Sequence, residues 1–315
     1  MDVGLGLWTM RSTAAYPASV PALYRRLRED AVLAEQLGFH SIWSAEHHFW
    51  YDGWCPTPIA AAAHAAAATT TLHVGTGIHL LPLYEPDAVA DDLAWLQRLS
   101  GGRVEYGVGL GYRAGEYDGF GRSRKVRGRR MDAALDRLLE LGDACPRVWV
   151  GGMAETALRR AASRGVGVML PSTLKPEQLA VAVEQVHAAA EEAGTRPRIG
   201  VMKYAWATDG SERQRDRAAE RLSSFTREYS GSWFPLKGQP GFEVPELLDA
   251  QMRRSAETAL LGAPDELAER LRGYAELGVE LCMLHLVGDA RLPDHRATME
   301  LIGQQVLPAL SEVAA

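Results

Sequence analysis

Cysteine is scarce in this chain of 315 residues, which contains only Cys55, Cys145 and Cys282. The three are odd in number, widely spaced and outside any Cys-x-x-Cys pattern, so the sequence indicates neither a disulfide framework nor a zinc site. No apolar run approaches the roughly 20 residues that span a bilayer, and the first residues do not resemble a secretory signal. We therefore expect no membrane association and a cytoplasmic location.

The sequence also lacks an excess of positive charge, since its formal net charge is −6 at pH 7. A chain without an overall positive field is poorly suited to neutralise phosphates, so nucleic-acid binding is not expected. The basic run at residues 122–130 is the local exception. Hydrophobic residues at 47% and charged residues at 23% are ordinary values, and they supply enough apolar material for one large core.

Short apolar segments of strand type alternate along the chain with segments whose apolar residues recur at helical spacing. The predicted strands are residues 3–8, 41–44, 72–78, 104–109, 148–151, 166–170, 199–207 and 281–287. Such alternation demands a parallel sheet, and eight units favour closure into a (β/α)8 TIM barrel over an open doubly wound sheet. We expect an α/β fold with a single barrel domain over residues 1–315.

Two segments interrupt this regularity. Residues 110–128 are rich in glycine and predict irregular structure after the fourth strand. Residues 229–250 carry several prolines and aromatic residues. Irregular connections longer than about 15 residues in a compact domain are usually lids or binding loops, so the second segment predicts an irregular lid.

The sequence HSIWSAEHHF at residues 40–49 places Glu46, His47 and His48 where the second predicted strand ends. In a barrel of parallel strands, the carboxyl ends of the strands form the catalytic rim. Neighbouring histidines at a strand end point in opposite directions and are poorly placed to chelate one ion together, so no metal site is expected. An acid/base site and a structural hydrogen-bond network both remain open.

Several motifs, in this order, resemble those of the bacterial luciferase-like flavin monooxygenase family. They lie at residues 38–49, 72–78, 103–113, 115–121, 148–152 and 261–266, and so cover nearly the whole chain. The resemblance implies a (β/α)8 barrel that binds reduced FMN, or the alternative 8-hydroxy-5-deazaflavin coenzyme, at the carboxyl ends of the strands. It also implies a homodimer formed through the alanine-rich helix predicted at residues 58–68 and the next helix.

The resemblance assigns roles to residues around the flavin ring. His47 matches the catalytic histidine of the family, and Glu46 or its neighbour's backbone would fix the imidazole tautomer. A cis non-prolyl peptide between Gly77 and Ile78 would pack against the ring. Glycine at position 109 would allow close approach of the backbone to the ring, with Tyr112 beside it.

The segment from Gly152 onward leads from a predicted strand into a helix, where free amides and the helix dipole favour an anion. An ordinary strand-to-helix turn explains the same pattern. The resemblance places the flavin phosphate here. We expect the amides of Gly152 and Met153 and the hydroxyl of Thr156 to hold it, with an arginine of the basic run. Arg129 is the first choice, and Arg124 and Arg127 remain open.

Aromatic residues gather at predicted strand ends and in the predicted lid, among them Trp8, Trp50, Trp206 and Trp233. Together they predict a large apolar substrate pocket beside the flavin. Luciferase alpha subunits carry cysteine at the position of Gly109 and a phosphate-binding arginine at that of Leu110. These two departures argue against true aldehyde luciferase activity.

The resulting prediction is a flavin-dependent monooxygenase that takes reduced FMN from a separate flavin reductase. It would use O2 to oxygenate a small, largely apolar organic substrate, with His47 moving protons. Two alternatives stay open. One is a deazaflavin-dependent oxidoreductase that transfers hydride, and the other is a non-catalytic flavin-binding partner subunit.

Overall fold

The computed structural model describes residues 1–12, 17–49, 54–233, 245–287 and 293–311. Eight parallel strands close into a barrel in the order β1, β2, β3, β4, β5, β6, β7, β9 and back to β1. They are β1 (Asp2–Trp8), β2 (Ser41–Ser44), β3 (His73–His79), β4 (Val104–Val108), β5 (Arg147–Gly151), β6 (Gly167–Leu170), β7 (Ile199–Ala207) and β9 (Leu281–Leu286). The predicted TIM barrel is confirmed.

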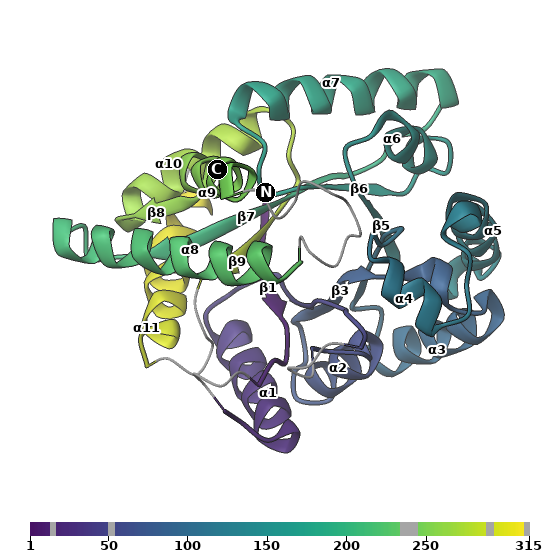
Figure 1. Ribbon diagram of the computed structural model, residues 1–315, viewed down its shortest axis with the longest axis horizontal. Helices are drawn as coiled ribbons and strands as arrows, with labels where there is room; N and C mark the ends of the chain where they lie inside the picture. The colour runs from purple at the N-terminus through teal and green to yellow at the C-terminus, as the bar shows by residue number, and fades with distance from the viewer. Residues whose placement is uncertain (13–16, 50–53, 234–244, 288–292, 312–315) are drawn as a thin grey trace.

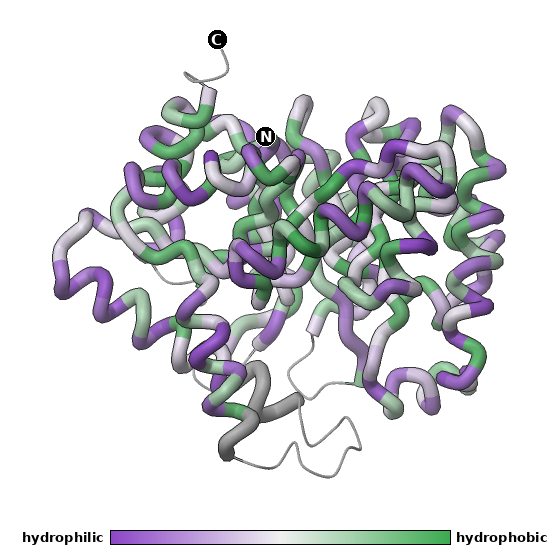
Figure 2. The backbone as a smooth tube through the Cα atoms, turned by 90° about the horizontal axis from the view of Figure 1, so that it is seen from above, coloured by the Kyte–Doolittle hydropathy of each residue, from purple (hydrophilic) through white to green (hydrophobic). Residues whose placement is uncertain are grey.

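Helices surround the strands (Figure 1). They are α1 (Val20–Gln36), α2 (Pro58–Ala66), α3 (Pro86–Leu99), α4 (Ala114–Gly119), α5 (Arg127–Leu139), α6 (Glu155–Ala162), α7 (Pro176–Ala193), α8 (Glu212–Trp233), α9 (Pro245–Thr258), α10 (Pro264–Glu276), α11 (Pro293–Leu301) and α12 (Leu307–Ser311). Proline opens α2, α3, α7 and α10, where its missing N–H costs nothing. In Figure 2 hydrophilic and hydrophobic stretches alternate along the outer helices, as expected of helices that bury one face.

Two tryptophans fill the inside of the barrel. Trp43 and Trp149 pack with Met169, Leu281 and Met283 in a cluster of their own. Glycines make room for the two indoles, because a Cβ atom at Gly75 would lie 2.4 Å from Trp43 and one at Gly167 would lie 2.5 Å from Trp149. The interior is thus a packed core, and any ligand must bind at an end of the barrel.

Three details differ from the sequence-based expectation. Residues 110–128 are not wholly irregular, because they contain α4 and a 3₁₀ turn at Arg124–Val126. The segment expected to be irregular at residues 229–250 is helical at both ends, since α8 continues to Trp233 and Pro245 starts α9 instead of interrupting the chain. A short strand, β8 (Leu260–Gly262), pairs with the end of β7.

The barrel has two distinct ends. We call the end at the carboxyl termini of the strands the mouth and the opposite end the base. His47 and His79 follow or end strands at the mouth, whereas Asp2 and His73 begin strands at the base. None of the described helices combines the length and the apolar character needed to cross a membrane.

Candidate active site at the mouth of the barrel

His47 lies directly beyond β2 and is paired with a carboxylate from a different part of the chain. Its Nδ1 atom lies 2.9 Å from Oε1 of Glu116, a buried residue of α4. The same oxygen accepts hydrogen bonds from the backbone N–H of His48 at 3.1 Å and from Nη1 of Arg113 at 3.1 Å. Because an ionised carboxylate only accepts, we assign the imidazole proton to Nδ1, which leaves the lone pair on Nε2.

His47 is buried, with only 7% of the residue exposed, and this burial disfavours the charged form of its imidazole. Desolvation lowers the pKa of His47 below its ordinary value, and the hydrogen bond and charge of Glu116 oppose that shift. The imidazole is therefore neutral near pH 7 and can accept a proton at Nε2. The second carboxylate oxygen of Glu116, Oε2, is buried and has no hydrogen-bond partner within the described part of the chain.

Glu46 serves a separate cluster. Its carboxylate lies 2.5 Å from Nε2 of His48 and accepts from the hydroxyl of Tyr84 and the amide of Leu80. Burial raises the pKa of Glu46, but the nearby His79 and the hydrogen bond with His48 outweigh it and hold the pKa below its usual range. The expectation that Glu46 fixes the tautomer of His47 is therefore wrong, because Glu116 occupies that position.

Ile78 lies across neighbouring strands on a surface of glycines. The peptide bond between Gly77 and Ile78 is cis, as predicted. A Cβ atom at Gly109 would lie 2.9 Å from Cγ2 of Ile78, and one at Gly151 would lie 1.9 Å from its Cδ1. The space beside Gly109 is thus occupied by this side chain, and it is Ile78, only partly buried, that faces the open mouth.

Aromatic side chains surround His47. The ring of Trp54 meets the imidazole edge-on with centroids 4.8 Å apart, and Tyr112 does so at 6.0 Å. Trp54 is buried and Tyr112 is 37% exposed, so the aromatic neighbours of the imidazole reach from the interior to the surface.

The family model of the luciferase-like monooxygenases matches residues 4–281 of this chain. The chain belongs to this family. Members are flavin-dependent oxidoreductases, so the protein is an enzyme of that type. The oxygenase component of the flavin-dependent trigonelline monooxygenase of Acinetobacter baylyi is 24% identical over 92% of this chain and 91% of that protein. An uncharacterized protein of Sinorhizobium fredii is 40% identical, but the match spans only 30% of its length and 34% of this chain.

Solved structures share the whole fold of this family member. The oxygenating constituent of 3,6-diketocamphane monooxygenase from Pseudomonas putida, in complex with FMN, superimposes with a TM-score of 0.78 at 19% identity, covering 98% of each chain. An F420-dependent secondary alcohol dehydrogenase with an F420-acetone adduct superimposes with a TM-score of 0.74 at 20% identity, again covering 98% of each chain. Such identities establish a common fold alone.

The turn between β5 and α6 differs from the expected family phosphate site in one respect. The amide of Gly152 donates to the carbonyl of Met169 at 3.1 Å, which extends the pairing of β5 with β6 by one residue. It is therefore not free to bind an anion, and the expectation for that amide is wrong. Met153 is half-exposed and Thr156 is exposed at the start of α6.

The arginines of the basic run are unequal in this luciferase-like barrel. Arg129 is exposed on α5. Arg127 is partly buried, and its Nε atom has no hydrogen-bond partner among the residues described. Arg130 is held by the carbonyls of Pro82 and Tyr84. An unpartnered buried donor makes Arg127 a second contender beside Arg129.

Two of the expected pocket tryptophans meet at one histidine. Trp8 contacts the ring of His295 edge-on at 5.8 Å, and Trp206 does so at 6.1 Å. The guanidinium of Arg221 lies 4.6 Å above Trp206. Trp50 and the side chain of Trp233 lie outside the described residues, so the structure brings two of the four tryptophans together.

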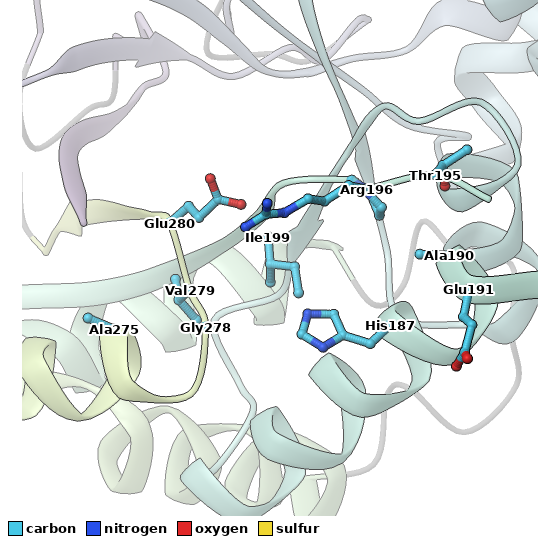
Figure 3. Close-up of a pocket in the computed structure, with 11 residues that line it drawn as sticks. His187, Ala190, Glu191, Thr195, Arg196, Ile199, Ala275, Gly278, Val279 and Glu280 are labelled. Carbon is cyan, nitrogen blue, oxygen red and sulfur yellow. The ribbon is translucent and has the colours of Figure 1, made fainter. Parts of the chain in front are cut away.

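A cleft of about 500 Å³ lies at the other end of the barrel, between the ends of α7 and α10 (Figure 3). Ionisable side chains on its walls are His187, Glu191, Arg196 and Glu280, all exposed. Its floor is formed by Ile199 at the start of β7. Active sites of such barrels lie at the mouth, and the buried acid/base pairs are there as well, so the cleft is not the candidate active site.

Proposed function

We propose that this enzyme is a monooxygenase that uses reduced FMN from a separate flavin reductase and O2 to oxygenate a small, largely apolar organic substrate. The observation that carries the proposal is the pair of His47 and Glu116 at the mouth, where the partly exposed Ile78 of the neighbouring strand β3 also lies. A bound flavin supplies the redox chemistry, since its reduced ring activates oxygen. The similarity to an oxygenase component supports a separate source of reduced flavin.

The residues at the mouth fit a flavin. The side chain of Ile78, which packs over Gly109 and Gly151, gives an apolar surface on which a planar ring can lie. The buried Oε2 of Glu116 still needs a donor, which a ring or substrate N–H or O–H can supply. His47 accepts and returns a proton at Nε2, and Glu116 holds it in the tautomer that makes this possible.

The phosphate of FMN would lie at the amino end of α6. Its partners would be the amide of Met153, the hydroxyl of Thr156 and one arginine, Arg129 or Arg127. Separate replacement of the two arginines by alanine distinguishes them, because loss of the phosphate contact weakens FMN binding more than riboflavin binding. The variant that loses this preference for FMN identifies the phosphate ligand.

The first test identifies the cofactor. Titrations with FMN and with the deazaflavin coenzyme, followed by fluorescence quenching, should show tighter binding of FMN. Air is then mixed with the complex of reduced FMN. A transient absorbing species that outlasts the reaction of free reduced FMN is expected of an oxygenase, whereas immediate reoxidation would indicate a flavin carrier or partner subunit.

A panel of apolar ketones and aldehydes, assayed by mass spectrometry for the gain of one oxygen atom, then seeks the substrate. No gain of oxygen with any member of the panel, together with a stable complex of the deazaflavin coenzyme, would favour the alternative function of hydride transfer. The fold shared with an F420-dependent dehydrogenase supports that alternative.

We propose in addition that the enzyme is a homodimer formed through α2 and α3. Trp95 and Leu99 on α3 are 63% and 78% exposed, although both are large and apolar. Such side chains on one helix are suited to burial against a second copy of the chain. Light scattering should give twice the mass of the chain, and the double variant Trp95→Glu with Leu99→Glu should give the monomer mass.

A further inference from the structure

Two histidines and a glutamate meet at the base of the barrel, the end opposite to the mouth. His40 precedes β2, His73 begins β3 and Glu105 lies in β4. Nε2 of His40 lies 3.2 Å from Oε1 of Glu105, and Nδ1 of His73 lies 3.1 Å from the same oxygen. The three ligand atoms all lie within 4.8 Å of one another, and among the described residues no other group of histidine, cysteine or carboxylate ligands is so arranged.

Both imidazoles present a nitrogen to the carboxylate, but only Nε2 of His40 makes a hydrogen bond with it, at 3.2 Å. Nδ1 of His73 is buried and lacks hydrogen-bond geometry to any described partner, despite its distance from Glu105. Behind His40, Nδ1 lies 3.7 Å from Oδ2 of Asp2. This distance is too long for a hydrogen bond, but Asp2 lies close enough to favour a proton on Nδ1 once a metal has displaced the proton of Nε2, as carboxylates behind metal-binding histidines do.

Glu105 holds a full negative charge at this place. It is 0% exposed, its Oε2 accepts from Nε1 of Trp149 at 2.6 Å, and its Oε1 also accepts from Arg147. Burial raises the pKa of Glu105, but the neighbouring His40 and His73, Arg147 and Trp149 outweigh it and bring the pKa to about 2. Without a metal, the N–H at Nε2 of His40 donates to this anion, and a bound cation would take the place of that proton between the nitrogen and the carboxylate.

We propose that His40, His73 and Glu105 bind one divalent ion of the zinc type at the base of the barrel. Two imidazoles and one carboxylate select zinc and its neighbours over magnesium or calcium, which prefer oxygen ligands. Three protein ligands leave a fourth position for water. The histidine side chains are 20% and 22% exposed, so an ion reaches the site from solvent.

Two adjustments accompany binding. The rings of His40 and His73 are stacked, with centroids 4.4 Å apart and planes 23° apart, so they tilt until both lone pairs converge on the ion. Arg147 leaves Oε1 of Glu105, and its side chain is 42% exposed and free to reach solvent. The ion replaces the positive charge that Arg147 supplies to the carboxylate.

The test uses the full-length, tag-free chain after treatment with EDTA. Calorimetric titration with Zn²⁺ should give one saturable site per chain. Titration with Co²⁺ should develop the visible absorption of a four- or five-coordinate ion. Zinc should leave the affinity for FMN unchanged, because the site lies at the opposite end of the barrel from the mouth.

The variants His40→Ala and His73→Ala should each abolish the site, and Asp2→Asn should weaken it by about tenfold. His187→Ala, at an exposed position on α7, is the control and should bind zinc like the original chain. Circular dichroism and thermal melting in EDTA show whether each variant is folded, and one folded ligand variant suffices. The absence of saturable binding, or binding that survives in a folded His40→Ala or His73→Ala variant, would overturn the proposal.

Discussion

Histidines are paired with buried glutamates at both ends of the barrel, but the stoichiometry differs. At the mouth His47 and His48 are hydrogen-bonded to different carboxylates, His47 to Glu116 and His48 to Glu46. At the base His40 and His73 share the single carboxylate of Glu105, which Arg147 and Trp149 also hold. A carboxylate that is hydrogen-bonded to one imidazole fixes its tautomer and leaves the other nitrogen basic, which suits proton transfer. A shared carboxylate is immobilised from several sides and joins strands.

The base extends this joining role through a chain of ion pairs. Glu280 holds Nε of Arg198 at 3.1 Å, and Nη2 of Arg198 lies 3.0 Å from Asp2. Asp2 in turn faces His40. Residues of β1, β4 and β5 and neighbours of β2, β7 and β9 thereby meet in one network. The comparison assigns chemistry to the mouth and cohesion to the base.

The largest expected effect separates the two ends directly. His47→Gln removes the basic nitrogen at the mouth, so kcat for the substrate found in the ketone and aldehyde panel should fall by about 10² to 10⁴, the usual contribution of general acid/base catalysis. The dissociation constant of FMN should change little. His73→Gln at the base is the matched variant and should keep kcat. Equal losses in both variants would erase the distinction between the ends.

The second effect is a substitution at the base that should lower stability and leave kcat unchanged. Glu105→Gln leaves His40, His73 and Arg147 without their buried anion, and breaking a buried ion pair costs about 3 to 5 kcal/mol. Urea denaturation in EDTA should show that loss in the free energy of unfolding, while kcat at a temperature below the transition stays near the original value. A Glu105→Gln variant with an unchanged free energy of unfolding would contradict the claim that the ion pairs at the base stabilise the barrel.

A smaller effect concerns His285, a histidine at the mouth for which no carboxylate partner occurs among the described residues. Burial lowers the pKa of His285 to about 4, and its ring packs against Tyr204 and Phe225. Its folded pKa lies below the unfolded value, so the unfolded chain binds the extra proton first. Stability from this group is complete above about pH 6.5 and is lost as the pH falls to about 4, by about 3 kcal/mol.

In the variant His285→Phe, the free energy of unfolding should fall less as the pH is lowered from about 7 to about 4, the range between the unfolded and folded pKa values of His285. Urea denaturation at several pH values in this range measures that dependence. An unchanged slope in the variant would show that other groups cause the acid dependence. His48, which has the carboxylate of Glu46, offers the contrasting case of a paired histidine.

The spacing of apolar residues in the sequence predicted the barrel well, because strands and helices each have a characteristic local period of apolar residues. The motif ending in His47 was placed at the mouth for the same reason. Glu116 was missed, because it pairs with a residue 69 positions away and the glycines around it masked the short helix α4. The amide of Gly152 was assigned to an anion because its bond to Met169 depends on the pairing of strands, which no local pattern reveals.

The central proposal, that a flavin lies on Ile78 at the mouth, is tested most directly by the FMN affinity of Gly151→Ala. The new Cβ atom would overlap Cδ1 of Ile78, the far end of a side chain that can rotate outward, into the space proposed for the ring. We predict that the dissociation constant rises by about tenfold or more, the effect of about 1 to 3 kcal/mol of overpacking, with little change in melting temperature. Gly273→Ala on α10, where nothing lies within 4 Å of the added atom, is the control and should bind FMN normally. Unchanged FMN affinity in a folded Gly151→Ala variant would contradict the proposed position of the flavin.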